Sequence, residues 1–127
     1  MTTGIEAMTT ASLSLALDAA SLRHQAIAAN IANIKTQGYV PQRVNFEAQL
    51  ASAQHSLHEQ GSIAPQDLIG VGAHLESALN AAGQPVVLQL DGLVAQMAQN
   101  AVQYQALVKG LTRHMSLLMS AASDGKK

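Results

Sequence analysis

The first 38 residues predict one long helix with apolar side chains on two opposite faces. Alternating steps of three and four residues define a first row from Ile5 to Asn33, and a second row lies roughly 200° away at about 100° per residue. A helix that is apolar all round is normally buried, and one partner helix covers only one of its faces. We therefore expect the first row to pair within the chain and the second to contact neighbouring subunits. The first row includes Met8, Leu15, Leu22 and Ala29, and the second, the expected inter-subunit face, includes Leu13, Leu17, Ile27, Ile31 and Ile34.

The last part of the chain, residues 87–127, predicts a second long helix with a cleaner pattern. One apolar row follows the alternating step without a break, as in a coiled-coil seam. The reverse face of this helix mixes apolar residues with Gln, Asn, Gly and His. The expected seam consists of Leu90, Val94, Met97, Ala101, Tyr104, Val108, Leu111, Met115 and Leu118.

The middle segment, residues 39–86, contains all three prolines and four of the nine glycines, so we expect it to be short, irregular and rich in loops. Asn45 is a possible N-cap for a short helix near residues 45–58, and Gly61 follows as a stop. Residues 62–84 show no firm period. A helical turn or two is expected between Ala73 and Ala82.

The predicted fold is all-α, with the two terminal helices paired as an antiparallel coiled-coil hairpin. Gly38 follows the last periodic residue of the first helix, and a left-handed glycine is a common way to end a helix. The middle segment must return the chain, so Leu22 is expected beside Tyr104 and Leu15 beside Leu111. Residues 1–38, 39–86 and 87–127 are the three expected parts.

Composition supports a helical chain and excludes several classes of function. Hydrophobic residues make up 48%, but Trp is absent, Phe occurs once and Tyr twice. Much of the apolar content is Ala, which favours closely packed helices. A formal net charge of −1 lacks the basic surface of a nucleic-acid binder, and we expect neither a cleaved signal peptide nor direct membrane insertion.

The segment from Asn30 to Tyr39 carries the most specific motif, Asn-Ile-Ala-Asn-Ile-Lys-Thr-Gln-Gly-Tyr. It resembles the Asn-(Leu/Ile)-Ala-Asn-x-x-Thr-x-Gly-Tyr signature of the flagellar rod and hook axial proteins. Two further segments, 43–50 and 97–107, are similar to the FlgB-type branch of that family, the proximal rod proteins. The signature residues carried over are Asn30, Ile31, Ala32, Asn33, Thr36, Gly38 and Tyr39. Gln37, Lys35 and the pair 93–94 depart from the usual pattern.

This resemblance implies a structural subunit of the proximal rod of the bacterial flagellar basal body, which polymerises through its terminal helices and transmits torque. It implies export by the flagellar type III apparatus and a periplasmic position in the rod. The implied partners are copies of the chain itself, the other rod proteins (FlgC and the distal rod proteins), the rod adaptor FliE and the MS-ring protein FliF.

The sequence offers little catalytic or ligand-binding chemistry, so we expect no enzyme activity, cofactor or metal. His55 and His58 lie near Glu59, but no second motif supplies a fourth metal ligand, and a solvated helix surface is the better interpretation. The Gly70–Gly72 segment lacks the further glycine and the lysine of phosphate-binding loops. The carboxylates are dispersed, without the pairing that acid–base catalysis needs.

A second class of function uses the same apolar faces. The chain could be a soluble helical adaptor or chaperone that binds one partner chain, as amphipathic helices often do. The signature favours the polymerising subunit. Concentration-dependent assembly would separate it from a stoichiometric complex.

Overall fold

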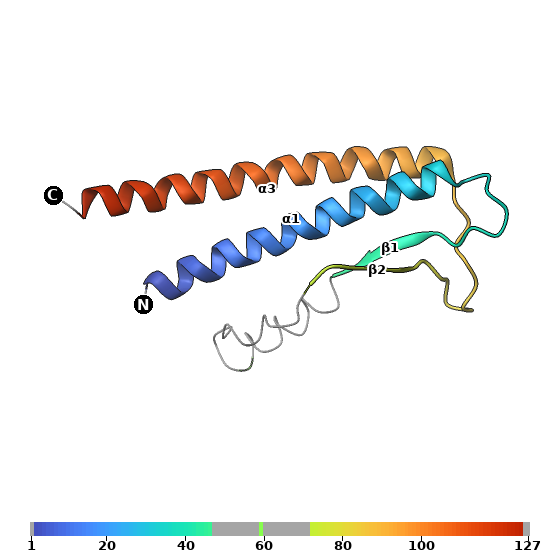
Figure 1. The fold of residues 1–127 in the computed structure, drawn as a ribbon, viewed down its shortest axis with the longest axis horizontal. Coiled ribbons are helices and arrows are strands. Elements are labelled where there is room, and N and C mark those ends of the chain that lie inside the picture. The colour runs from blue at the N-terminus through green and yellow to red at the C-terminus, as the bar shows by residue number, and fades with distance from the viewer. Residues whose placement is uncertain (1, 47–58, 60–71, 126–127) are drawn as a thin grey trace.

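A computed structural model describes the backbone of residues 2–46, 59 and 72–125, and the side chains of the same residues from Thr10 onward. Two long helices dominate it: α1 (Thr2–Ala32) and α3 (Leu90–Asp124). They run antiparallel along one another, and α1 lies between α3 and a small two-stranded sheet (Figure 1). The predicted helical hairpin is therefore confirmed. The sheet was not predicted.

The chain leaves α1 through a series of turns. Asn33 still donates its backbone N–H to the carbonyl of Ala29, and the N–H of Tyr39 then reaches the carbonyl of Thr36 at 3.3 Å. Within this last turn Gly38 has a φ of +80°, as the sequence predicted. An L side chain is strained at such an angle, so a glycine is needed here. It lies beyond the helix end, in the turn that sends the chain back.

The sheet consists of β1 (Gln42–Asn45) and β2 (His74–Ser77), paired antiparallel with Val44 opposite Leu75. Strand β2 lies where one or two helical turns were expected between Ala73 and Ala82, so that prediction is wrong. Asn45, the suggested helix cap, is the last residue of β1. The predicted helix near 45–58 otherwise falls outside the described residues, as do His55 and His58.

A tight turn after β2 leads the chain towards α3. Asn80 accepts the backbone N–H groups of Ala82 and Gln84 on its side-chain oxygen, and its own N–H donates to the carbonyl of Gln84. Gly83 has a φ of +76° in this turn. Asn and Gly are the residues that such turns favour, because one caps local N–H groups and the other accepts positive φ.

The core of the described residues is thin and rich in alanine. Four of its seven buried apolar residues are alanines, which let the backbones approach closely but bury little area each. Helix α3, although 35 residues long, buries only two side chains. The buried apolar residues are Ala19, Ala20, Ala26, Ile27, Phe46, Ala78 and Leu93.

Candidate assembly surface

The signature residues hold the returning chain against α1. Asn30 is only 5% exposed, and its side-chain amide bonds both backbone groups of Gln42: Nδ2 donates to the carbonyl at 2.8 Å, and Oδ1 accepts the N–H at 2.9 Å. The hydroxyl of Tyr39 donates to the same oxygen at 2.9 Å. One asparagine thus attaches the start of β1 to the last turns of α1, as a neighbouring strand would.

The second asparagine of the signature acts within the helix end. Asn33 Nδ2 donates to the carbonyl of Ala29 at 2.9 Å, and Thr36 Oγ1 donates to Asn33 Oδ1 at 3.2 Å. These two bonds give hydrogen-bond partners to the Ala29 carbonyl and to the Asn33 side chain at the point where the backbone bonds of α1 end. Ile31 is half-buried and Ala32 is exposed, so neither shares the network. The polar signature residues have local partners, which explains their spacing without a second chain.

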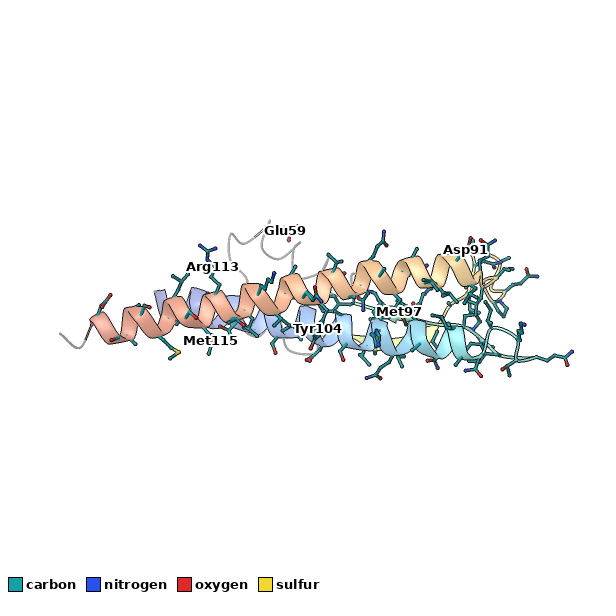
Figure 2. The ribbon with its side chains drawn as sticks, turned by 90° about the horizontal axis from the view of Figure 1, so that it is seen from above. Glu59, Asp91, Met97, Tyr104, Arg113 and Met115 are labelled. Atoms are coloured by element: carbon teal, nitrogen blue, oxygen red, sulfur yellow. The ribbon has the colours of Figure 1, made fainter. Side chains whose placement is uncertain are left out.

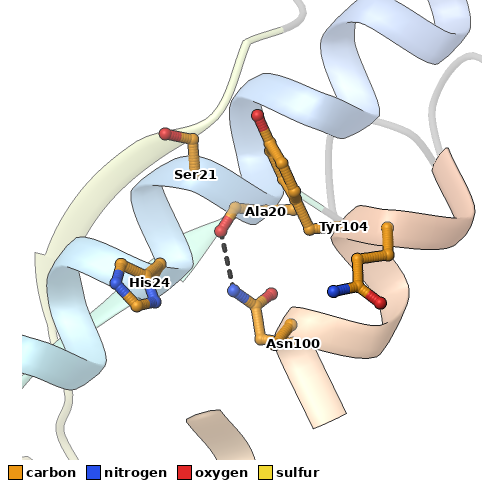
Figure 3. A pocket seen from close by; sticks show the side chains of 7 residues that line it. Ala20, Ser21, His24, Asn100 and Tyr104 are labelled. Atoms are coloured by element: carbon orange, nitrogen blue, oxygen red, sulfur yellow. Dashed lines mark hydrogen bonds between the residues drawn. The ribbon is translucent and has the colours of Figure 1, made fainter. Parts of the chain in front are cut away.

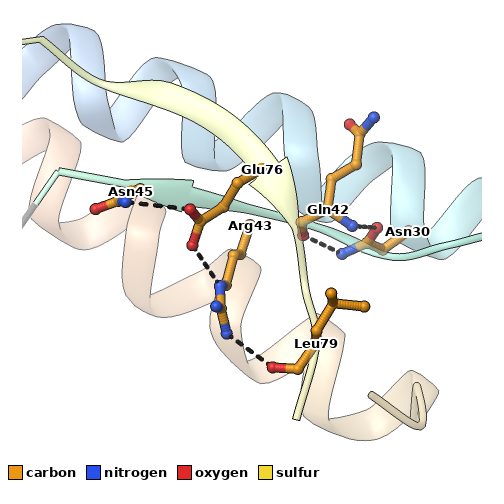
Figure 4. Close-up of polar contacts among 6 residues, drawn as sticks. All are labelled: Asn30, Gln42, Arg43, Asn45, Glu76 and Leu79. Carbon is orange, nitrogen blue, oxygen red and sulfur yellow. Dashed lines mark hydrogen bonds and ion pairs between the residues drawn. The ribbon is translucent and has the colours of Figure 1, made fainter. Parts of the chain in front are cut away.

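Strands β1 and β2 are joined by charged and polar side chains (Figure 4). Arg43 Nε lies 2.7 Å from Glu76 Oε1, and Asn45 Nδ2 donates to the other carboxylate oxygen at 3.1 Å. The hydrogen bond from Arg43, with its charge, holds the pKa of Glu76 below the usual range. Arg43 also donates to the carbonyl of Leu79 at 3.3 Å. This cluster fixes the sheet and offers no catalytic arrangement.

Between the two helices one buried polar side chain sets the register. Asn100 is 4% exposed, and its Nδ2 donates to the carbonyl of Ala20 on α1 at 2.8 Å (Figure 3). A methyl group added at Gly110 would lie 3.9 Å from Leu13 Cδ2. Asn100 thus lies beside Ala20 and Gly110 beside Leu13, whereas the predicted pairs Leu22–Tyr104 and Leu15–Leu111 would place α3 three to six residues further along. The helices are antiparallel as predicted, but their register is shifted by about 4.5–9 Å.

The faces that meet differ from those predicted. Leu13 and Ala20 belong to the second row of α1, and Ile27 of that row is 4% exposed. The row expected to contact neighbours is therefore at least partly covered by the chain itself, and that prediction is wrong for Leu13 and Ile27. In the first row Ala19 and Ala26 are buried, at 2% exposure each, and Leu15, Leu22 and Ala29 are half-buried and lie about half a turn away from α3. The side chain of Met8 is outside the described part. Of the remaining second-row residues, Leu17, Ile31 and Ile34 are half-buried.

Helix α3 is rotated by roughly 60° about its axis from the predicted position. The less exposed residues of α3 include three seam members, Met97, Leu111 and Leu118, together with Leu93, Asn100, Leu107 and His114. The other predicted seam residues face solvent in the described structure. They are Leu90 (52% exposed), Val94 (53%), Tyr104 (43%), Val108 (39%), Met115 (46%) and Ala101.

The solvent-facing part of this seam, named here the open row, consists of Leu90, Val94, Ala101, Tyr104, Val108 and Met115. Large apolar side chains scattered singly on a surface are ordinary, but an aligned row marks an interaction surface. Figure 2 shows Met115 extending from α3 on the side opposite to Arg113. No residue of the open row is charged, and the centres of protein interfaces are likewise poor in charged residues.

A pocket of about 310 Å³ opens between the helices beside the open row (Figure 3). Ser21 and His24 line it from α1, and Ala101 and Tyr104 line it from α3. Asn100 also lines it, and its buried Oδ1 has no hydrogen-bond partner among the residues that the structure describes. Because Nδ2 is held by a carbonyl, the amide cannot turn over to present a donor. A buried acceptor without a donor is costly.

Sequence patterns missed Asn100, because the prediction placed it on the mixed reverse face of the second helix. The signal was present as a step of seven, since Leu93, Asn100, Leu107 and His114 form a row of their own. Gln42 was missed for another reason. Only its backbone bonds Asn30, so its side-chain type carried no information.

No match was found to a protein-family model, to a curated protein or to a solved structure. No helix of the described residues has the length and apolar character needed to cross a bilayer. The same part of the chain contains no group of three or more His, Asp and Glu side chains placed to hold a metal ion.

Proposed function

We propose that the chain is a structural subunit of the proximal rod of the bacterial flagellar basal body and polymerises through its terminal helices. The observation that carries this proposal is the open row on α3. A helix of 35 residues, about 53 Å long, buries two side chains and leaves a line of apolar ones in solvent. Such a helix needs neighbours along most of its length.

The signature network adds support of a different kind. A motif that resembles the axial-protein signature forms a compact connection from α1 to β1, through Asn30, Tyr39 and Gln42. This connection holds β1 against the side of α1 that is turned away from α3 (Figure 1). In this proposal the neighbours are copies of the chain and the other rod proteins, and the site of assembly is the periplasmic rod.

Two measurements test the function. Basal bodies purified from the source cells should contain the chain on a blot, and deletion of its gene should abolish swimming with restoration from a plasmid. The purified chain should sediment as large particles above a threshold concentration. A chain absent from basal bodies, or one that forms a one-to-one complex with a single partner and never self-assembles, would support a helical adaptor instead.

A further inference from the structure

The pocket of about 310 Å³ between α1 and α3 has apolar walls and polar groups but no fixed charge. Among the described residues its lining contains no Asp, Glu, Lys or Arg. Ala20 and Ala101 leave room between the two helices, and Tyr104 adds an aromatic ring (Figure 3). The volume is at the lower end of the range of small-molecule sites. A pocket of this size and character fits a small neutral molecule.

One wall of the pocket holds an acceptor that has no donor. Asn100 is 4% exposed, and its Oδ1 has no hydrogen-bond partner among the described residues. Its Nδ2 donates to the Ala20 carbonyl at 2.8 Å, which fixes the amide with its oxygen on the side of Tyr104 (Figure 3). Buried acceptors in native proteins are almost always paired. A molecule that enters the pocket with an N–H or O–H group gives this oxygen its partner.

The Asn100 oxygen is buried, so a ligand reaches it only after a neighbouring side chain moves. Tyr104 lies one helical turn from Asn100 on the same side of α3, and it is 43% exposed. Because much of this side chain is already in solvent, it can turn to another rotamer with little loss of buried area. Tyr104 is therefore the residue placed to open a path from solvent to Asn100 Oδ1.

We propose that this pocket binds a small neutral aromatic compound with an N–H or O–H group, which donates to Asn100 Oδ1 while the ring packs against Tyr104. Two aromatic rings attract one another in offset or edge-to-face contacts, beyond the area that they bury. Ala20 and Ala101 supply the apolar surface that the ligand covers. This inference goes beyond the proposed function and does not depend on it.

An ordered water molecule is the competing partner for the buried oxygen. A water donates the same hydrogen bond but leaves the apolar walls of the pocket uncovered, whereas an aromatic donor does both. The two partners are distinguished by whether the donor group of a ligand contributes to its affinity.

Indole and N-methylindole are matched probes for this question, because they have nearly the same shape and only indole has an N–H donor. The isotope-labelled full-length chain is titrated with each compound in amide NMR spectra, at a concentration below that of assembly. We expect indole to shift the signals of Ser21, Ala101 and the Asn100 side-chain amide. Indole should bind about fivefold more tightly than N-methylindole, as one hydrogen bond implies.

Three variants of α3 assign the site, with helical content checked first by circular dichroism. Asn100→Leu removes the acceptor, so indole and N-methylindole should bind with equal affinity. Ala101→Leu fills the pocket and should weaken indole binding by about tenfold or more. Ala106→Leu makes the same change at an exposed position of α3 that does not line the pocket, and it should leave the affinity unchanged.

Several results would overturn the inference. Equal affinity of the unmodified chain for the two probes, or a preference for indole that persists in Asn100→Leu, would mean that Asn100 Oδ1 receives no bond from the ligand. Signal changes centred on Val94 or Met115 would place the aromatic compound on the open row and outside the pocket. Absence of a saturable shift up to the solubility limit of indole would mean that the pocket holds no such ligand. None of these results bears on assembly, so this inference and the proposed function fail separately.

Discussion

Replacing the buried Asn30 by Ala should be among the most destabilising single changes in α1, although it removes only an amide. The side chain makes three hydrogen bonds, two to the backbone of Gln42 and one to the hydroxyl of Tyr39. All three are lost together in Asn30→Ala. The backbone of Gln42, at the start of β1, then loses both of its hydrogen bonds to α1.

The size of the effect follows from the groups left behind. A buried donor or acceptor that loses its partner costs about 1–3 kcal/mol. The Tyr39 hydroxyl is half-buried and Gln42 is exposed, so water replaces part of what these groups lose. We expect a fall of about 1–3 kcal/mol in the free energy of unfolding, a large part of what a small domain has.

Urea unfolding followed by circular dichroism measures this change. Asn33→Ala is the matched control, because Asn33 bonds within its own turn and should cost about 1 kcal/mol or less. Asn30→Asp refines the test: its carboxylate keeps the acceptor but faces the Gln42 carbonyl, and acid below about pH 4 should restore a donor and much of the stability. Equal losses for Asn30→Ala and Asn33→Ala would refute the role given to Asn30.

Three further predictions concern other sites. Gly38→Ala should lower the free energy of unfolding by about 1 kcal/mol because φ is +80°, whereas Gly92→Ala, in open space on α3, should raise it by about 0.5–1 kcal/mol; urea unfolding compares them. The hydrogen bond from Arg43 lowers the pKa of Glu76, so this carboxylate stabilises the sheet above the ordinary pKa of a glutamate, and the stabilisation is lost as the pH falls through the lowered pKa of Glu76. Glu76→Gln should remove this pH dependence, which an NMR titration of the strand resonances would measure. Asn100→Leu removes a buried oxygen that has no partner among the described residues, so the chain should melt at the same or a higher temperature in a thermal scan followed by circular dichroism.

Periodicity predicted the two helices and their antiparallel pairing, but not the register, which is shifted by three to six residues. The helices and their pairing follow from long apolar rows and from the return that the middle segment must make. The position of Gly38 in a left-handed turn was also predictable, because glycine is the residue that such a φ favours. The sheet was not, since β1 and β2 are four residues each and carry no clear alternation. Their pairing depends on Asn30, Arg43 and Glu76, which are far apart in the sequence.

Periodicity could not predict which apolar face of α1 packs against α3, and the reason is physical. Helix α1 has two apolar rows of the same period, so either can pack against α3 in the same register. The chain's choice depends on particular contacts: Asn100 reaches the Ala20 carbonyl, and Asn30 draws β1 onto an adjoining side of the helix. Both contacts are polar and long-range, and neither appears in a hydrophobic pattern. Helix α1 uses both rows within the chain: Leu13 and Ala20 of the second row lie against α3, and Ala19 and Ala26 of the first row are buried on a helix that also contacts β1. Two apolar rows on one helix therefore indicate two packing partners, and the hydrophobic pattern alone does not say which partner each row meets.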